Sequence, residues 1–300
     1  MFNQVLSATI AGVDVIPVTV EADVSNGLPM FVMVGYLSSQ VKEAQDRVRT
    51  AMRNIGIALP PKRITINLAP ADVRKDGSRF DLPIAAAILA ATGNIPEKSL
   101  EQVMIIGELS LNGEVHGVPG VLPSVIQARE CGCKMCIIPY QNRREGKSIG
   151  GIHIVGVRSL QEMLTLLRDG VIPEEEGEVK EEATLPNPYE VDFSDIQGQD
   201  AVKRAAVIAV AGFHNLLMVG PPGSGKTMVA KRIPTILPGL TEKERLEISK
   251  IYSIAGLLPE DAPILGIRPF RSPHHTVSPQ ALAGGGKVPT PGEITLAHRG

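Results

Sequence analysis

The residues with the clearest chemical potential form a glycine-rich stretch, "GPPGSGKT", at 220–227. Its spacing matches the phosphate-binding pattern G-x-x-x-x-G-K-[ST]. Glycines let successive backbone N–H groups turn toward a phosphate, and the N-terminus of a following helix adds the positive end of its dipole. Lys226 is expected to reach the β and γ phosphates, and the Thr227 hydroxyl to bind Mg²⁺. The stretch therefore predicts ATP and Mg²⁺ as cofactors, with Lys226 as the catalytic cation.

The segments around this loop agree with that interpretation. "HNLLMVG" before it predicts a strand at Asn215–Val219, and "TMVAKRIP" after it predicts a helix cut short by Pro234. A strand, a loop and a helix in this order are the context that the motif requires. The alternative is a glycine-rich turn without a ligand. The residues predicted to bind the cofactor are Gly220, Pro221, Pro222, Gly223, Ser224, Gly225, Lys226 and Thr227.

Hydrolysis needs one more group than the loop supplies. ATPases with this loop use an acidic residue on a neighbouring strand to hold Mg²⁺ and to order the attacking water. No apolar strand ending in Asp-Glu follows Thr227, and Asp261 lies in the loop sequence "PEDAP". The chain is therefore expected to bind ATP and to stop before its catalytic acid, which leaves its status as an enzyme open.

A second candidate site lies in "VRKDGSRFDLPIAAAI", residues 73–88. A polar turn with Ser78 runs directly into an apolar segment, with Lys75 and Asp76 close by. Ser78 is either a nucleophile beside a base or part of the turn and cap that start a helix running to Ala90. The neighbouring Arg79 could bind a phosphate, or it could pair with Asp81 or Asp76.

The elements that carry these residues follow from periodicity and turn signals. Apolar residues at helical spacing predict a helix over 38–56, with Val41, Ala44, Val48, Met52 and Ile55 on its buried face. Further helices are predicted at 80–90 and 122–132, and "GELSLNGEVHGV" predicts a hairpin that turns at Asn112-Gly113. Strands are predicted at 15–24, 64–68 and 133–139.

An acidic stretch divides the chain. Residues 173–188, "PEEEGEVKEEATLPNP", hold six Glu, one Lys and three Pro, and have no apolar face to bury. We predict one domain at 1–172, an acidic linker at 173–190 and a second domain at 191–300. In the second domain we expect a helix at 199–212, a helix after a capping box of Thr241 and Glu244, and loops with a short hairpin over 262–292.

Three weaker signals have competing explanations. Residues 42–79 are basic, which suits either contact with a nucleic-acid backbone or a solvated helix face with pairs such as Glu43–Arg47. Packing in a buried strand is favoured over zinc binding for the three cysteines. Adjacent side chains in an extended loop point apart, which argues against metal binding by His274-His275. The basic residues are Lys42, Arg47, Arg49, Arg53, Lys62, Arg63, Arg74, Lys75 and Arg79; the cysteines are Cys131, Cys133 and Cys136.

Composition limits the class of protein. Hydrophobic residues make up 43% of the 300 residues, aromatic residues only 3%, and the net charge is −2. These values predict an aliphatic core and say little about partners. No apolar run reaches the ~18 residues of a membrane span, and the first twelve residues lack the features of a signal peptide. We therefore expect a cytoplasmic protein without a membrane partner.

Longer segments carry a family resemblance. "DIQGQDAVKRAAVIAVAGFHNLLMVGPPGSGKT" resembles the opening of an AAA+ module, and "RPFRSPHHTVSPQALAGGG" with "PGEITLAHRG" resembles its magnesium-chelatase-like branch. Together with the N-terminal region they resemble the ComM/YifB group of bacterial magnesium-chelatase-like ATPases. In that group "GEITLAHRG" is followed directly by the Walker B strand, so the resemblance implies a C-terminal truncation.

The N-terminal region resembles the proteolytic domain of Lon-type proteases. Aligning "KDG" places the nucleophile position at Arg79, and aligning "GVPGVLPSVI" places the position of the lysine base at Leu122. Leu122 has no amine to accept a hydroxyl proton, and Ser78 is one residue early, about 100° away around a helix. The resemblance therefore implies an α+β domain of Lon-like fold without peptidase activity, followed by a partial α/β P-loop NTPase (AAA+) domain.

The resemblance also implies a function. It points to a ring, expected to be a hexamer, since AAA+ sites are completed by an arginine from the neighbouring subunit. It also points to DNA as the substrate of a helicase or branch-migration motor in DNA uptake and recombination. The alternatives are a magnesium-chelatase-type motor and a non-catalytic nucleotide-binding module.

Overall fold

The computed structural model describes residues 1–174, 191–259, 261–286 and 289–300. The predicted acidic linker lies outside these ranges except for its first two residues. Within the described ranges, no helix is long and apolar enough to cross a membrane.

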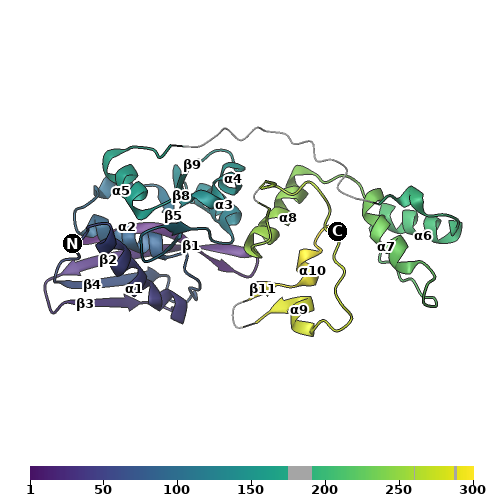
Figure 1. The fold of residues 1–300 in the computed structure, drawn as a ribbon, viewed down its shortest axis with the longest axis horizontal. Coiled ribbons are helices and arrows are strands. Elements are labelled where there is room, and N and C mark those ends of the chain that lie inside the picture. The colour runs from purple at the N-terminus through teal and green to yellow at the C-terminus, as the bar shows by residue number, and fades with distance from the viewer. Residues whose placement is uncertain (175–190, 260, 287–288) are drawn as a thin grey trace.

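The first 157 residues contain one mixed sheet of seven strands (Figure 1). The strand order is β3-β4-β2-β1-β5-β8-β9. β1 and β2 are antiparallel, as are β2 and β4, while the other neighbouring pairs are parallel. The sheet is thus closer to the α/β class than the predicted α+β class. Its strands are β1 (Phe2–Ala11), β2 (Asp14–Ser25), β3 (Met30–Val34), β4 (Arg63–Ala69), β5 (Val103–Ile105), β8 (Met135–Pro139) and β9 (His153–Val157).

Helices cover both faces of this sheet. Alternate residues of a strand point to opposite faces, and two apolar clusters follow that rule: Ile105 and Ile137 belong to one, Met104 and Cys136 to the other. The first cluster includes residues of α1 (Ser39–Asn54), α2 (Asp81–Ala91) and α5 (Leu160–Asp169). The second includes α3 (Val121–Glu130) and lies beside the short α4 (Arg143–Lys147).

Local sequence signals for this region are confirmed in most places. In α1, Val41, Ala44, Val48 and Met52 are fully buried, as the periodicity predicted, and every residue of α2 is buried. The predicted hairpin forms as two short strands, β6 (Glu108–Leu109) and β7 (Val115–His116). Gly113 has a φ of +89° in the connecting turn, a conformation that glycine adopts without strain.

The region after the linker contains helices and one small ladder. Its α-helices are α6 (Asp200–Ala211), α7 (Lys226–Arg232), α8 (Glu242–Ile254), α9 (Pro279–Ala283) and α10 (Glu293–Leu296). It also contains the short 3-10 helices η3 (Phe193–Asp195) and η4 (Ile233–Ile236), while η1 (Glu97–Leu100) and η2 (Tyr140–Asn142) belong to the sheet-bearing region. β10 (Gly284–Gly285) and β11 (Thr290–Pro291) pair as a short hairpin, as predicted. The capping box of α8 is also confirmed: Thr241 Oγ1 accepts from Glu244 N at 3.3 Å, and Glu244 Oε2 accepts from Thr241 N at 2.9 Å.

The strand predicted at Asn215–Val219 does not form. Leu217 and Val219 are each 87% exposed. A strand satisfies its backbone groups by pairing with a neighbour, and no described strand pairs with this segment. The prediction was wrong because it rested on the apolar run alone, and an apolar run forms a strand only where a neighbouring strand can pair with it.

Helix α8 connects the two regions. It packs along α3 (Figure 1), where Leu246 and the following Ile264 add to the apolar cluster on the α3 face of the sheet. At its C-terminal end, Ser253 O accepts a hydrogen bond from Gly120 N at 2.8 Å, and the Ser253 hydroxyl donates to the Glu145 carboxylate at 2.5 Å. Ser253 and Ile254 are 3% and 8% exposed, so this contact excludes water.

Candidate functional site

The glycine-rich loop at 220–227 leads directly into α7. Gly223 and Gly225 have φ values of +80° and +84°, and Gly225 is the residue that precedes the helix. Both conformations favour glycine because other residues would be strained there. These two glycines therefore set the curvature of the loop.

Lys226 folds back onto the loop. Its Nζ donates to Gly220 O at 2.9 Å, to Pro221 O at 2.8 Å and to Ser224 Oγ at 3.2 Å. An ammonium has three donors, so the loop uses all of them. A phosphate bound here would replace some of these acceptors with phosphate oxygens, which form stronger charge-assisted bonds. The ammonium already lies inside the loop, which fits a phosphate ligand.

Thr227, the predicted metal ligand, is exposed at the start of α7. Its hydroxyl is an oxygen donor of the kind Mg²⁺ accepts, and Mg²⁺ commonly takes its other ligands from substrate phosphates and water. Across the described part of the chain, no group of three or more His, Cys, Asp or Glu side chains could hold a metal ion. A Mg²⁺ ion at the loop would thus depend on the nucleotide for most of its ligands.

The segment before α6 lies against the loop. Gln199 Nε2 donates to Ser224 O at 3.1 Å. Further along, Phe193 N donates to Thr235 Oγ1 at 3.1 Å, and Arg232 lies 3.4 Å from Asp195. Gln199 was not among the residues predicted for this site. Gln199 was predicted as the first residue of a helix over 199–212, whereas it precedes α6 in a left-handed conformation with a φ of +53°.

Arg79 lies in the interior and pairs with neither predicted partner. It is 4% exposed. Its Nη2 donates to Ser124 Oγ at 2.7 Å, and that hydroxyl donates to Gly120 O at 2.6 Å. The two suggested ion pairs were wrong because other cations hold those carboxylates: Arg74 is 2.6 Å from Asp76, and Arg47 is 2.7 Å from Asp81.

The Arg79 guanidinium is incompletely satisfied. Its Nε and Nη1 have no hydrogen-bond partner within the described ranges. Burial lowers the pKa of Arg79 to about 10, while the charge of Glu145 acts in the opposite direction. Arg79 remains a cation at neutral pH, and it stands inside the protein with one neutral acceptor.

The other residues of the protease-like turn also have structural partners. The Ser78 hydroxyl donates to the Glu108 carboxylate, and its carbonyl accepts from Asp81 N at 3.1 Å. Ser78 is thus part of the turn before α2, as predicted, but its side chain does not cap the helix. Leu122 is fully buried, and its N–H donates to Glu145 Oε1 at 2.8 Å.

A buried ion pair lies beside this turn. Arg47 Nε and Nη2 donate to the two carboxylate oxygens of Asp81 at 2.7 and 2.9 Å, and Leu109 N donates to Asp81 at 3.2 Å. The Asp81 side chain is 1% exposed. Burial raises the pKa of the Asp81 carboxyl, while Arg47 acts against that shift. The predicted pair Glu43–Arg47 is present at 3.7 Å.

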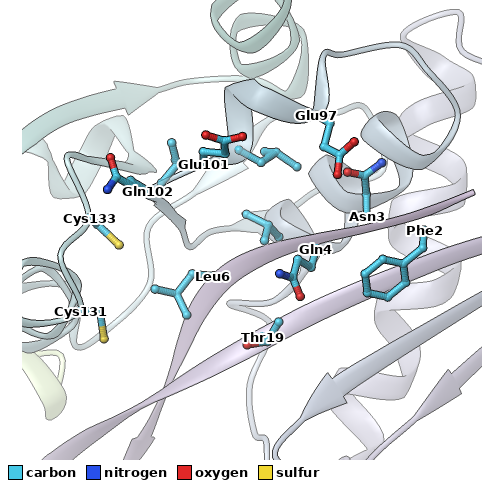
Figure 2. A pocket seen from close by; sticks show the side chains of 13 residues that line it. Phe2, Asn3, Gln4, Leu6, Thr19, Glu97, Glu101, Gln102, Cys131 and Cys133 are labelled. Atoms are coloured by element: carbon cyan, nitrogen blue, oxygen red, sulfur yellow. The ribbon is translucent and has the colours of Figure 1, made fainter.

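The cysteines divide between core and surface. Cys133 and Cys136 are 7% and 0% exposed in the apolar cluster of the α3 face, which confirms packing for these two. Burial raises the pKa of both thiols. Cys131 is exposed. Figure 2 shows Cys131 and Cys133 at one side of a hollow of about 520 Å³ that Glu101 also lines.

The prediction that His274 and His275 point apart was wrong. Their ring centroids are 4.1 Å apart, with an angle of 39° between the rings. The segment turns instead of extending, because Val277 N donates to His274 O at 2.9 Å. His274 Nδ1 also lies 2.7 Å from Thr276 Oγ1.

Comparison with known proteins assigns the chain to a family. Models described as magnesium chelatase, subunit ChlI, and subunit ChlI of Mg-chelatase match residues 192–300 and 20–142. YifB of Escherichia coli is 44% identical over 96% of this chain, and competence protein ComM of Haemophilus influenzae is 42% identical over 99%. The chain belongs to the ComM/YifB family of magnesium-chelatase-like proteins. It spans 56% of the length of YifB and 58% of ComM.

This ComM/YifB-family chain is also similar to Lon proteases. Lon protease 2 of Bacillus subtilis is 36% identical over 127 residues, which is 42% of this chain and 22% of that protease. The mostly parallel sheet of residues 2–157 is consistent with a Lon-like fold. Relatives of two kinds thus match this chain: YifB and ComM along nearly all of it, and a segment of Lon along part of it.

Proposed function

We propose that this ComM/YifB-family chain is the ATP-binding part of an AAA+ motor. The observation that carries the proposal is the loop at 220–227, where two glycines at positive φ and the Lys226 ammonium meet at the start of α7. We assign residues 1–172 to a Lon-like domain without a Ser–Lys dyad, 173–190 to an acidic linker, and 191–300 to the first part of the AAA+ module.

In this proposal ATP lies with its phosphates on residues 220–227 and Mg²⁺ on the Thr227 hydroxyl. The Mg²⁺ ion would neutralise charge on the β and γ phosphates. Lys226 exchanges its loop acceptors for phosphate oxygens. The ammonium is already held at the loop by Gly220 O, Pro221 O and Ser224 Oγ, so it changes hydrogen-bond partners without a large movement of the side chain.

Binding of Mg²⁺–ATP to the 300-residue chain tests this assignment by calorimetry. Lys226→Ala is expected to abolish measurable binding, and Thr227→Ala is expected to weaken binding only when Mg²⁺ is present. Lys231→Ala is the matched control, since Lys231 is an exposed lysine on the same helix. Equal affinity of Lys226→Ala and Lys231→Ala would contradict the nucleotide site.

For the whole protein we propose a hexameric motor that acts on DNA, as a helicase or branch-migration ATPase. The support is family membership and a relative named a competence protein. The test is ATPase activity of the longer protein with single-stranded, duplex and branched DNA. Stimulation by at least one of these structures is expected. Stimulation by none of them would remove DNA as the substrate.

A magnesium-chelatase-type motor is the second candidate, because both matching family models describe a magnesium chelatase subunit. The same assay separates the two. Activation by chelatase partner subunits, with no response to DNA, would favour the chelatase function. Nucleotide binding without turnover under either condition would leave a non-catalytic nucleotide-binding module.

A further inference from the structure

The structure separates the nine basic residues of 42–79 into two sets. Four are occupied: Arg47 and Arg74 form ion pairs, Lys75 donates to backbone carbonyls, and Arg79 donates to Ser124. The other five are exposed and have no side-chain partner among the described residues. We call these five the basic surface: Lys42, Arg49 and Arg53 on α1, and Lys62 and Arg63 where the chain enters β4.

The three cations on α1 form a stripe. At 100° per residue, positions 42, 49 and 53 fall within about 40° of one another around the helix. They extend over about 16 Å along its axis, at 1.5 Å per residue. Figure 1 shows α1 at the edge of the molecule beside β3 and β4. A strand of duplex DNA carries one phosphate per 3.4 Å of its axis, so the stripe matches the length of several phosphates.

The charge of this region differs from that of the whole chain. Residues 39–63 contain six basic and two acidic residues, a net charge of +4, whereas the chain carries −2. One of the acidic residues, Glu43, lies beside Arg47. Cations that lack protein partners can exchange water and counterions for phosphates, and the release of those counterions drives such binding.

We propose that the α1 part of the basic surface, Lys42, Arg49 and Arg53, binds the sugar-phosphate backbone of DNA. This inference rests on the proposed DNA substrate and adds a contact outside the AAA+ module. Residues 39–63 include no aromatic residue, so the basic surface itself offers no side chain on which a base could stack. Binding at this surface is therefore independent of sequence and strongly dependent on salt.

Asp46 provides an internal test of this proposal. It is exposed on the same stripe, about 40° from Lys42 around the helix, and no partner is described for its carboxylate. A carboxylate among phosphate-binding cations repels the ligand. Its removal should strengthen binding of DNA, whereas a purely structural role of the helix predicts no gain.

The experiment measures binding of the 300-residue chain to a fluorescein-labelled DNA duplex of mixed sequence at several salt concentrations. The test variant is Lys42→Gln/Arg49→Gln/Arg53→Gln. The matched control, Lys98→Gln/Lys134→Gln/Arg144→Gln, removes the same charge from exposed residues on other elements. Asp46→Asn is the third variant. Circular dichroism verifies that all variants keep the helix content of the parent chain.

We expect the test variant to bind at least about tenfold more weakly at low salt, with a salt slope smaller by about 0.9 for each phosphate that is no longer bound. The control should stay near the parent, and Asp46→Asn should bind more tightly. Equal weakening of DNA binding in the test and control variants would contradict the proposed binding surface on α1, but it would not contradict the proposed DNA motor. No binding of DNA by the parent chain or the longer protein would overturn both. Binding of anionic lipid vesicles but not DNA through these residues would assign the surface to a membrane instead.

Discussion

Arg79 is an arginine in the interior whose guanidinium donates to a single neutral hydroxyl and forms no ion pair among the described residues. The only described hydrogen bond of its side chain goes to Ser124, and Glu145 adds attraction from a greater distance. A buried charge is expensive unless it is well paired. The residue therefore stabilises the fold less through its charge than through the volume of its side chain.

Substitution of Arg79 and Ser124 separates these contributions. Ser124→Ala should cost about 1–3 kcal/mol, because it removes the one acceptor of a buried cation. Arg79→Met keeps most of the volume without the charge and should be neutral or stabilising. In the double variant, Ser124→Ala should cost much less than alone. Chemical denaturation of the four proteins measures this coupling, and strict additivity would contradict it.

Breaking the Asp81–Arg47 ion pair should make the stability of the protein depend on pH. Arg47→Gln leaves a buried carboxylate without its cation and should cost about 3–5 kcal/mol at neutral pH. Burial raises the pKa of Asp81 in the folded protein above its value in the unfolded chain. Protonation therefore favours the folded state, so the variant should recover stability, relative to the parent, as pH falls toward and below that raised pKa.

Denaturation midpoints of parent and variant between neutral and mildly acidic pH measure this recovery. Arg47→Gln/Asp81→Asn is the control, since it has no carboxylate to protonate and should show no such recovery. If the loss of stability in Arg47→Gln stays constant with pH, the unpaired Asp81 carboxylate is not the cause of that loss.

Among the secondary-structure elements, those with strong local signals were predictable. Helix α1 follows from apolar spacing, α2 follows from a long apolar run, and the start of α8 follows from Thr241 and Glu244. The missing strand at Asn215–Val219 was not predictable, because strand formation depends on a neighbouring strand rather than on local sequence. The partner of Arg79 lies 45 residues away on α3, and no local pattern encodes that contact. The candidate loop at 220–227 was found because its residues are contiguous.

The capping box gives a prediction for one element. Thr241→Ala removes an acceptor of the Glu244 N–H and should destabilise the protein by about 1 kcal/mol. Thr165→Ala, at a partly exposed position inside α5, is the control and should change stability by less than about 0.5 kcal/mol. Amide hydrogen exchange should show faster opening at the first turn of α8 only in Thr241→Ala.

For the molecule as a whole, α8 is the element that joins the region after the linker to the sheet-bearing region. Two hydrogen bonds of Ser253 and the apolar contacts of Leu246 and Ile264 hold it there. The Glu145 carboxylate links α8 to α3, since it accepts hydrogen bonds from the Ser253 hydroxyl and from Leu122 N. The two regions are therefore expected to move together at this end of α8.

Ser253→Ala together with Glu145→Gln should loosen this contact. We expect the amides at the C-terminal end of α8 to exchange faster, while those of β1 and β2 keep their protection. Ser272→Ala, at an exposed serine, is the control. Unchanged exchange in α8 would show that the apolar contacts alone hold the helix.

The contact of α8 also makes a protease site difficult to install in this chain. Placing serine at Arg79 and lysine at Leu122 would put an amine in a fully buried apolar cluster. There it would meet a Glu145 carboxylate that already binds Leu122 N and Ser253. A carboxylate beside a lysine favours the charged ammonium, whereas a dyad needs the neutral amine as its base. Glu145, which Ser253 of α8 contacts, therefore opposes peptidase chemistry in addition to the two missing residues.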